Sequence, residues 1–155
     1  MPDSICLEPI AFVRNSRPAP EDDFWGGVIS EIVLAESVPE EALLGLEAFS
    51  HIEVIFHFNK VDPETIRFSG HPRGNTNYPL TGILAQRKKD RPNRIGLCAA
   101  EVVAVEGRTI TVRRLDAIDG TPVLDIKPVL REFQPVGEIR QPEWATDLMQ
   151  QYWKE

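Results

Sequence analysis

Short apolar runs separated by turn residues recur along the chain, a pattern typical of a β protein. Ile110 and Val112 alternate with polar neighbours, which indicates a strand with one buried and one solvated face. The run 52–58 is apolar at nearly every position and suits a strand buried on both faces. We expect strands over residues 5–13, 28–34, 52–58, 80–85, 97–105 and 109–115.

Two segments carry helical signals. Near residues 39–47 we expect a short helix, because Pro39 precedes Glu40 and Glu41, which suit the positive end of a helix dipole. Residues 143–154 predict a C-terminal helix with Trp144, Leu148 and Tyr152 on one face.

The connections complete a fold prediction. Glu106-Gly107 predicts a tight hairpin, and the Pro- and Gly-rich stretch 62–79 predicts a long loop, a kind of segment that often carries function. No long helix separates successive strands, as a parallel doubly wound sheet requires. We therefore expect a mainly β chain: a single mixed or antiparallel β-barrel domain over residues 1–155, with its core in 5–135.

Composition narrows the class of protein. The 155 residues carry a net charge of −7, which argues against a general nucleic-acid coat but allows a local basic patch. Without a long apolar run or a signal-peptide pattern, a cytoplasmic protein with no membrane partner is expected. Cys6 and Cys98 predict reduced thiols, and His51 and His57 lack a third ligand, so no metal is expected.

The region 82–128 carries the candidate chemistry. A dense basic cluster, which we call the basic turn, consists of Arg87, Lys88, Lys89, Arg91 and Arg94. It could be a solvated loop, or a cradle in which arginines grip phosphate or carboxylate. An acidic, turn-rich run follows at 115–128. There Asp116 could bond backbone amides, bind ribose hydroxyls or balance a sulfonium, while Asp125 and Lys127 predict a surface ion pair.

Two motifs in this region resemble the TsaA-like (TrmO) family. They are Arg91-Pro92-Asn93-Arg94-Ile95-Gly96-Leu97 and the run Leu115-Asp116-x-x-Asp119-Gly120-Thr121-Pro122-Val123-Leu124-Asp125-Ile126-Lys127-Pro128. Supporting pieces lie at 10–14 and 45–52, so the resemblance covers roughly residues 5–135. No G-x-G-x-x-G follows a strand, so an adenosyl cofactor would bind outside a Rossmann arrangement.

The resemblance implies a homodimeric β-barrel that binds S-adenosylmethionine near the subunit contact. It implies methylation of N6 of threonylcarbamoyl-adenosine at tRNA position 37. Matching motif positions assigns cofactor contacts to Asn59, Lys60, Arg87, Leu97, Arg113, Arg114, Leu115 and Asp116. Candidates for substrate or RNA contact are Lys88, Lys89, Arg91, Asn93 and Arg94. No general base is identified, and Asp116 is the candidate carried forward.

The chain also departs from the family pattern. Arg94 stands where the family usually has a second proline, and residues 21–25 do not supply the arginine that the family places in its N-terminal loop. The chain stops soon after the expected barrel, whereas the full-length bacterial tRNA enzymes have an extra C-terminal domain. Two alternatives therefore stay open: a methyltransferase for a small molecule or another RNA, and a non-catalytic S-adenosylmethionine-binding module. All three hypotheses expect Arg87 and Asp116 to meet.

Overall fold

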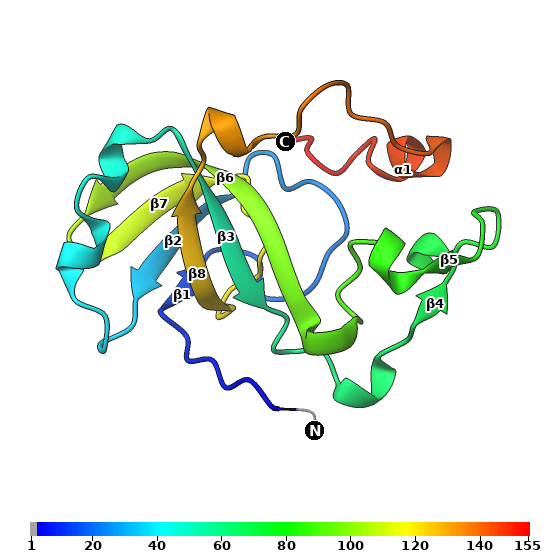
Figure 1. Ribbon diagram of the computed structural model, residues 1–155, viewed down its shortest axis with the longest axis horizontal. Helices are drawn as coiled ribbons and strands as arrows, with labels where there is room; N and C mark the ends of the chain where they lie inside the picture. Colours follow the sequence, from blue (N-terminus) through cyan, green and yellow to red (C-terminus); the bar gives the residue numbers. More distant parts are fainter. Residues whose placement is uncertain (1–2) are drawn as a thin grey trace.

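The computed structural model describes residues 3–155 and shows a closed antiparallel β-barrel (Figure 1). Each strand pairs with the next around the barrel, and the last pairs with the first. The order is β1 (Ala11–Arg14), β2 (Ile29–Leu34), β7 (Thr109–Arg113), β6 (Ile95–Glu106), β3 (His51–His57) and β8 (Pro122–Pro128). The predicted mainly β barrel with short helices is confirmed, and all its pairings are antiparallel.

Alternating side chains fill the barrel. Ile110 and Val112 of β7 are fully buried, as their alternation with polar residues predicts. On β3, Ile52, Val54 and Phe56 point inward, but the residues between them are half-buried. The prediction that this strand is buried on both faces was therefore wrong, because β3 has one core face and one partly covered outer face.

Several strands begin or end at other residues than predicted. The strand expected at 5–13 begins only at Ala11, and the one expected at 109–115 ends at Arg113 because Arg114 has a φ of 64°. Of the strand expected at 80–85, only β5 (Thr81–Gly82) forms, paired with β4 (Ser69–Gly70). The strand β8 was not among the predicted strands, although the ion pair expected between Asp125 and Lys127 assumed extended backbone there.

The helices are shorter than expected. In place of one helix near 39–47 there are two 3₁₀ helices, η1 (Glu40–Leu43) and η2 (Leu46–Ala48), separated by Gly45 with φ 84°. The C-terminal helix α1 (Glu143–Leu148) ends six residues before the predicted limit. The other 3₁₀ helices are η3 (Pro63–Thr65), η4 (Pro72–Gly74), η5 (Ile83–Ala85), η6 (Pro92–Arg94) and η7 (Arg131–Phe133).

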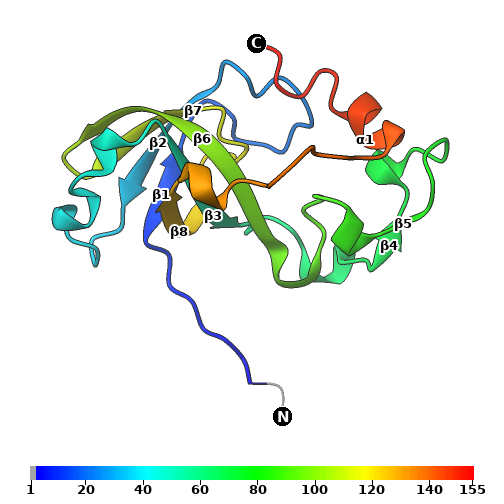
Figure 2. The same cartoon turned by 45° about the horizontal axis from the view of Figure 1, so that its top comes forward.

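Outside the barrel, α1 lies beside the β4–β5 pair in both views (Figures 1 and 2). The Tyr78 hydroxyl donates a hydrogen bond to Asp147, and the Tyr78 and Trp144 rings lie 6.4 Å apart. From α1 the chain turns back toward the barrel (Figure 2). Within residues 3–155, no helix is long and apolar enough to cross a membrane.

Candidate functional site

The basic turn and the turn after β7 meet at the start of β6. Leu115 is fully buried in the barrel core and holds its neighbour Asp116 in place. The Asp116 amide donates a hydrogen bond to Cys98 Sγ at 3.5 Å, and Arg87 donates one to the Leu97 carbonyl. Arg87 and Asp116 are thus brought together around two consecutive residues of β6.

The electrostatics of the site centre on Asp116. Burial raises the pKa of its carboxyl to about 6, although a hydrogen bond from Tyr152 and the charges of Arg87 and Arg17 act in the opposite direction. Burial also raises the pKa of the Cys98 thiol to about 11, so this thiol stays protonated at neutral pH. The pKa of the Tyr152 hydroxyl is raised by burial and by the Asp116 charge.

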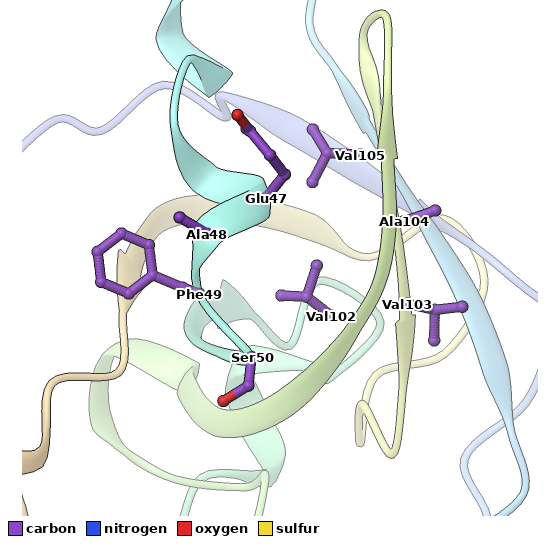
Figure 3. A pocket seen from close by; sticks show the side chains of 8 residues that line it. All are labelled: Glu47, Ala48, Phe49, Ser50, Val102, Val103, Ala104 and Val105. Atoms are coloured by element: carbon purple, nitrogen blue, oxygen red, sulfur yellow. The ribbon is translucent and has the colours of Figure 1, made fainter.

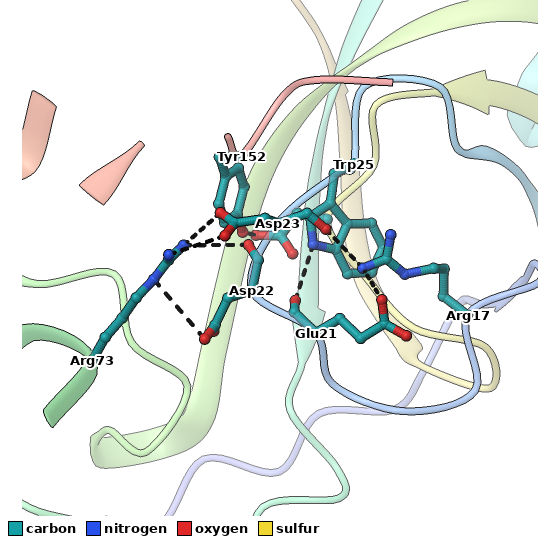
Figure 4. Close-up of polar contacts among 8 residues, drawn as sticks. Arg17, Glu21, Asp22, Asp23, Trp25, Arg73 and Tyr152 are labelled. Atoms are coloured by element: carbon teal, nitrogen blue, oxygen red, sulfur yellow. Dashed lines mark hydrogen bonds and ion pairs between the residues drawn. The ribbon is translucent and has the colours of Figure 1, made fainter. Parts of the chain in front are cut away.

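Arg17 supplies a cation that the sequence did not assign to the site. Its guanidinium lies 4.1 Å from the centre of the Trp25 ring and donates to the carbonyls of Asp23 and Phe24, both at 2.9 Å (Figure 4). It also forms an ion pair with Glu21 at 2.8 Å. The Arg17 Nε atom is buried and finds no hydrogen-bond partner among residues 3–155.

The long loop predicted at 62–79 reaches the same region through Arg73. The Arg73 guanidinium lies 2.9 Å from Asp23 and 4.0 Å from Asp22, and it approaches from the side opposite Arg17 (Figure 4). The acidic residues of the N-terminal loop are therefore held between two arginines.

Left-handed backbone conformations gather around the site. Among the described residues, the non-glycine positions with positive φ are Phe24 (65°), Arg73 (51°), Asn93 (62°), Arg94 (52°) and Arg114 (64°). Each such residue costs about 1–3 kcal/mol, and strain of this kind is typical of functional sites. At Arg94 it also explains the absence of the family's second proline, because a proline ring holds φ near −65°.

The basic turn is less open than the sequence suggested. Arg91 donates to the Gln86 carbonyl at 2.6 Å, and Arg94 donates to the Val61 carbonyl at 2.8 Å. Lys88 and Lys89 both lie beside Asp90, at 3.5 and 3.0 Å, yet each side chain keeps 42% exposure. These two lysines are the members of the cluster best placed to meet phosphate, and Asn93 is also exposed.

The remaining predicted positions lie at other points of the barrel end. Asn59 and Lys60 follow β3 and are exposed, and the Lys60 ammonium donates to the Pro18 carbonyl at 2.9 Å. Arg113 is exposed at the end of β7. The guanidinium of Arg114 lies 4.6 Å from the Trp153 ring.

Two surface cavities lie away from Asp116. One of about 340 Å³ lies between η2 and the far end of β6, with Phe49 and Val103 among its lining residues (Figure 3). The other, of about 450 Å³, is lined mainly by apolar residues around η1, with Asp125 at its margin. Neither contains the arginines and the carboxylate that carry the candidate chemistry.

The composition of the site fits an adenosyl amino acid. Asp116 offers an acceptor for ribose hydroxyls or a partner for a cation, and Arg87 offers donors for a carboxylate. The unpartnered Nε of Arg17 adds a donor that a ligand or water could satisfy. Sequence reasoning missed Arg17 and Trp153, and it placed Tyr152 only on a helix face. The Trp25-Gly26-Gly27 run was the available signal for a close backbone approach.

Comparisons with known proteins show which sequences this chain resembles. The family described as tRNA-methyltransferase O N-terminal domain matches residues 15–134. The human tRNA (adenine(37)-N6)-methyltransferase is 39% identical over 104 residues, covering 67% of this chain and 23% of the human protein. The chain thus spans about a quarter of that relative. An S-adenosyl-L-methionine-binding protein of Archaeoglobus fulgidus is 33% identical over 137 residues, covering 86% and 95%.

Solved structures show the same architecture. The crystal structure of TrmO from Pseudomonas aeruginosa matches with a TM-score of 0.73 at 26% identity. The match covers 93% of this chain and 63% of that one, so the solved chain extends well beyond the shared region.

Proposed function

The chain belongs to the family of the tRNA-methyltransferase O N-terminal domain, and we propose that it is an S-adenosylmethionine-dependent tRNA methyltransferase. The proposed acceptor is N6 of threonylcarbamoyl-adenosine at tRNA position 37. One observation carries the proposal: Arg87 and Asp116, which the resemblance assigns to the cofactor, meet around Leu97 and Cys98. The name of the human relative supports the choice of substrate.

In this proposal the ends of the cofactor bind opposite charges. Arg87 holds the methionine carboxylate, and Asp116 accepts hydrogen bonds from the ribose. When bound, S-adenosylmethionine supplies an electrophilic methyl group. The protein then has to align the acceptor nitrogen with this group and exclude water.

Asp116 is also the candidate acceptor for the proton that leaves the nitrogen. A carboxyl with a pKa of about 6 is mostly ionised at neutral pH, yet it is more basic than an ordinary aspartate. The two roles separate in kinetics. Asp116→Asn lowers kcat if the carboxylate takes the proton, and it raises KM for the cofactor if it only binds ribose.

The RNA contact falls to Lys88 and Lys89. Their side chains remain 42% exposed beside the site, whereas Arg91 and Arg94 are engaged with backbone carbonyls. Replacing both lysines by alanine should weaken retention on a tRNA column and flatten its salt dependence. Retention that is independent of these lysines would place the RNA on another face.

The direct test incubates the protein with methyl-labelled S-adenosylmethionine and tRNA from cells that lack this protein, followed by nucleoside analysis. We expect label in N6-methylated threonylcarbamoyl-adenosine, and loss of that label with Arg87→Ala. An exposed arginine outside the site, Arg140, provides the matched control variant Arg140→Ala. Label in another nucleoside or in a small molecule would contradict the proposed acceptor.

A second candidate is a binding module without catalysis. The Archaeoglobus relative is described only as an S-adenosyl-L-methionine-binding protein. The match covers 95% of its length, so that protein consists of little more than the region it shares with this chain. A protein that binds the cofactor but transfers no methyl group to any fraction of a cellular RNA extract would favour this candidate.

A further inference from the structure

The C-terminal segment, residues 150–155, lies along a loop of the barrel end. We call the loop residues Phe24, Trp25 and Gly26 the seat. Their amides donate in turn to the carbonyls of Gln151 at 3.2 Å, Tyr152 at 2.8 Å and Lys154 at 3.2 Å. A row of backbone hydrogen bonds of this kind resembles the addition of an extended peptide to a strand edge.

Gly26 makes this close approach possible. A Cβ atom added at Gly26 would lie 2.0 Å from the Trp153 carbonyl oxygen and 2.8 Å from its carbon. These are backbone atoms, so no side-chain rotation relieves the clash. At the neighbouring Gly27 the nearest atom would be Glu155 Cγ at 3.4 Å, the flexible part of a side chain. Within the seat, Gly26 is therefore the residue that allows the backbone of the segment to lie this close.

The segment presents two aromatic side chains to the candidate site. The Tyr152 hydroxyl donates to Asp116, close to Arg73 and Asp23 (Figure 4). The Trp153 ring lies 4.6 Å from the Arg114 guanidinium and packs against the barrel core. The two rings meet edge to face at 5.0 Å. The Tyr152 hydroxyl thus bonds the Asp116 carboxylate, and the flat Trp153 ring lies against the guanidinium of Arg114.

A nucleoside offers the same pair of groups, because ribose hydroxyls donate hydrogen bonds and a base has an aromatic face. We propose that the C-terminal segment is an internal competitor that occupies the nucleoside end of the site until an adenosine-containing ligand displaces it. The proposal rests on the proposed function, since it assumes that Asp116 and Arg114 bind the cofactor.

The way the segment is bound suits a displaceable element. Gln151, Lys154 and Glu155 are exposed, and Tyr152 and Trp153 are half-buried, so the segment is bound at the surface of the barrel. A ligand that competes with a docked segment binds with an apparent Kd raised by the inverse of the open fraction. Weakening the docked state should therefore tighten ligand binding.

The experiment compares the full chain with three variants. Gly26→Ala disrupts the seat, Gly27→Ala is the matched control, and Tyr152→Phe removes only the hydroxyl that bonds Asp116. Without ligand, hydrogen exchange at the amides of Trp25 and residue 26 reports docking of the segment. Exchange should be faster than in the unaltered chain for Gly26→Ala but not for Gly27→Ala. With S-adenosylmethionine as the probe, calorimetry measures the affinity.

We expect Gly26→Ala and Tyr152→Phe to bind the probe about fivefold or more tightly than the unaltered chain, from the loss of one charge-assisted hydrogen bond or more. Gly27→Ala should stay within about twofold, as ordinary contact distances allow. Equal or weaker binding by Tyr152→Phe, while the unaltered chain binds, would overturn the competitor and leave the proposed function standing. Absence of binding by all four proteins would contradict the proposed function and the inference together.

Discussion

Asp116 is a residue whose charge the fold disfavours. Its carboxyl has a pKa of about 6 in the folded protein against 3.8 as the ordinary value, and burial is the main cause. The folded state therefore binds a proton more readily than the unfolded chain between these two pH values. Stability from this residue is fully present below pH 4 and is lost as the pH rises to about 6, by at most about 3 kcal/mol.

Asp116→Asn should accordingly stabilise the protein at neutral pH. We expect a gain of about 1–3 kcal/mol at pH 7 and little difference at pH 4, because asparagine stays neutral and still accepts the Tyr152 hydrogen bond. Urea unfolding of both proteins at several pH values between 4 and 7 measures the difference. A variant less stable than the parent at pH 7, or a gain independent of pH, would contradict this account of the carboxyl.

A stabilising substitution at the centre of the site has a functional meaning. Proteins keep charges that destabilise the fold where binding or catalysis needs them. The same variant should therefore combine higher stability with weaker cofactor binding. That combination distinguishes Asp116 from a structural turn residue, whose loss weakens the fold.

At the scale of elements, β6 connects the core to the site. Gly96 allows this, because a Cβ atom there would lie 2.4 Å from Phe56 Cε2 and 2.9 Å from Phe58 Cζ. Phe56 is 2% exposed, and the two rings pack edge to face at 5.4 Å, so neither can move without opening the core. The next residues, Leu97 and Cys98, hold Arg87 and Asp116.

Gly96→Ala should destabilise the protein by about 1–3 kcal/mol through overpacking. Gly70→Ala is the matched control, because Gly70 also lies in a strand and a Cβ there meets no atom within 4 Å. Urea denaturation gives both values. Equal effects of the two substitutions would mean that the rings of Phe56 and Phe58 adapt and that β6 does not need this glycine.

The same elements show how far sequence patterns reach. The alternation of β7 and the Glu106-Gly107 turn predicted the β6–β7 hairpin, because one face is buried and the other is solvated. In contrast, β8 was missed because it begins with Pro122, ends with Pro128 and carries Asp125 and Lys127. A barrel strand accepts prolines at its ends, and those two charges form the predicted surface ion pair at 2.7 Å.

The candidate site was predictable only through the family resemblance. The resemblance assigned both Arg87 and Asp116 to the cofactor, although Arg87 lies outside the two quoted motifs. The position of Tyr152 could not be predicted, because the helix expected at 143–154 ends at Leu148. Beyond it, the carbonyls of residues 151, 152 and 154 accept hydrogen bonds from the seat instead of continuing a helix. The position of Arg17 depends on how the N-terminal loop brings its guanidinium over the Trp25 ring, a contact that no local sequence pattern encodes.

At the scale of the whole molecule, the outer face of β6 exposes several apolar side chains. Ile95, Leu97 and Val103 are 39%, 46% and 51% exposed on it, and Leu97 belongs to the candidate site. A second copy of the chain on this face would bury these side chains and lie next to the cofactor. This is the arrangement that the family resemblance implies.

We therefore expect a homodimer in solution. Light scattering should give twice the 17.5 kDa of one chain, and Val103→Glu should lower the mass toward the monomer by placing a charge in the contact. Val136→Glu is the control, because Val136 is 99% exposed on the segment that leads to α1. A mass of 17.5 kDa at all concentrations would contradict the dimer.

The proposed function requires a ligand that binds between Arg87 and Asp116. Calorimetric titration with S-adenosylmethionine tests this most directly, with Arg87→Ala as the test variant and Arg140→Ala as the control. We predict that the unaltered chain and Arg140→Ala bind with equal affinity, and that Arg87→Ala binds about tenfold or more weakly through loss of a charge-assisted contact. No heat from the unaltered chain at millimolar ligand, or equal affinity of Arg87→Ala, would contradict the account.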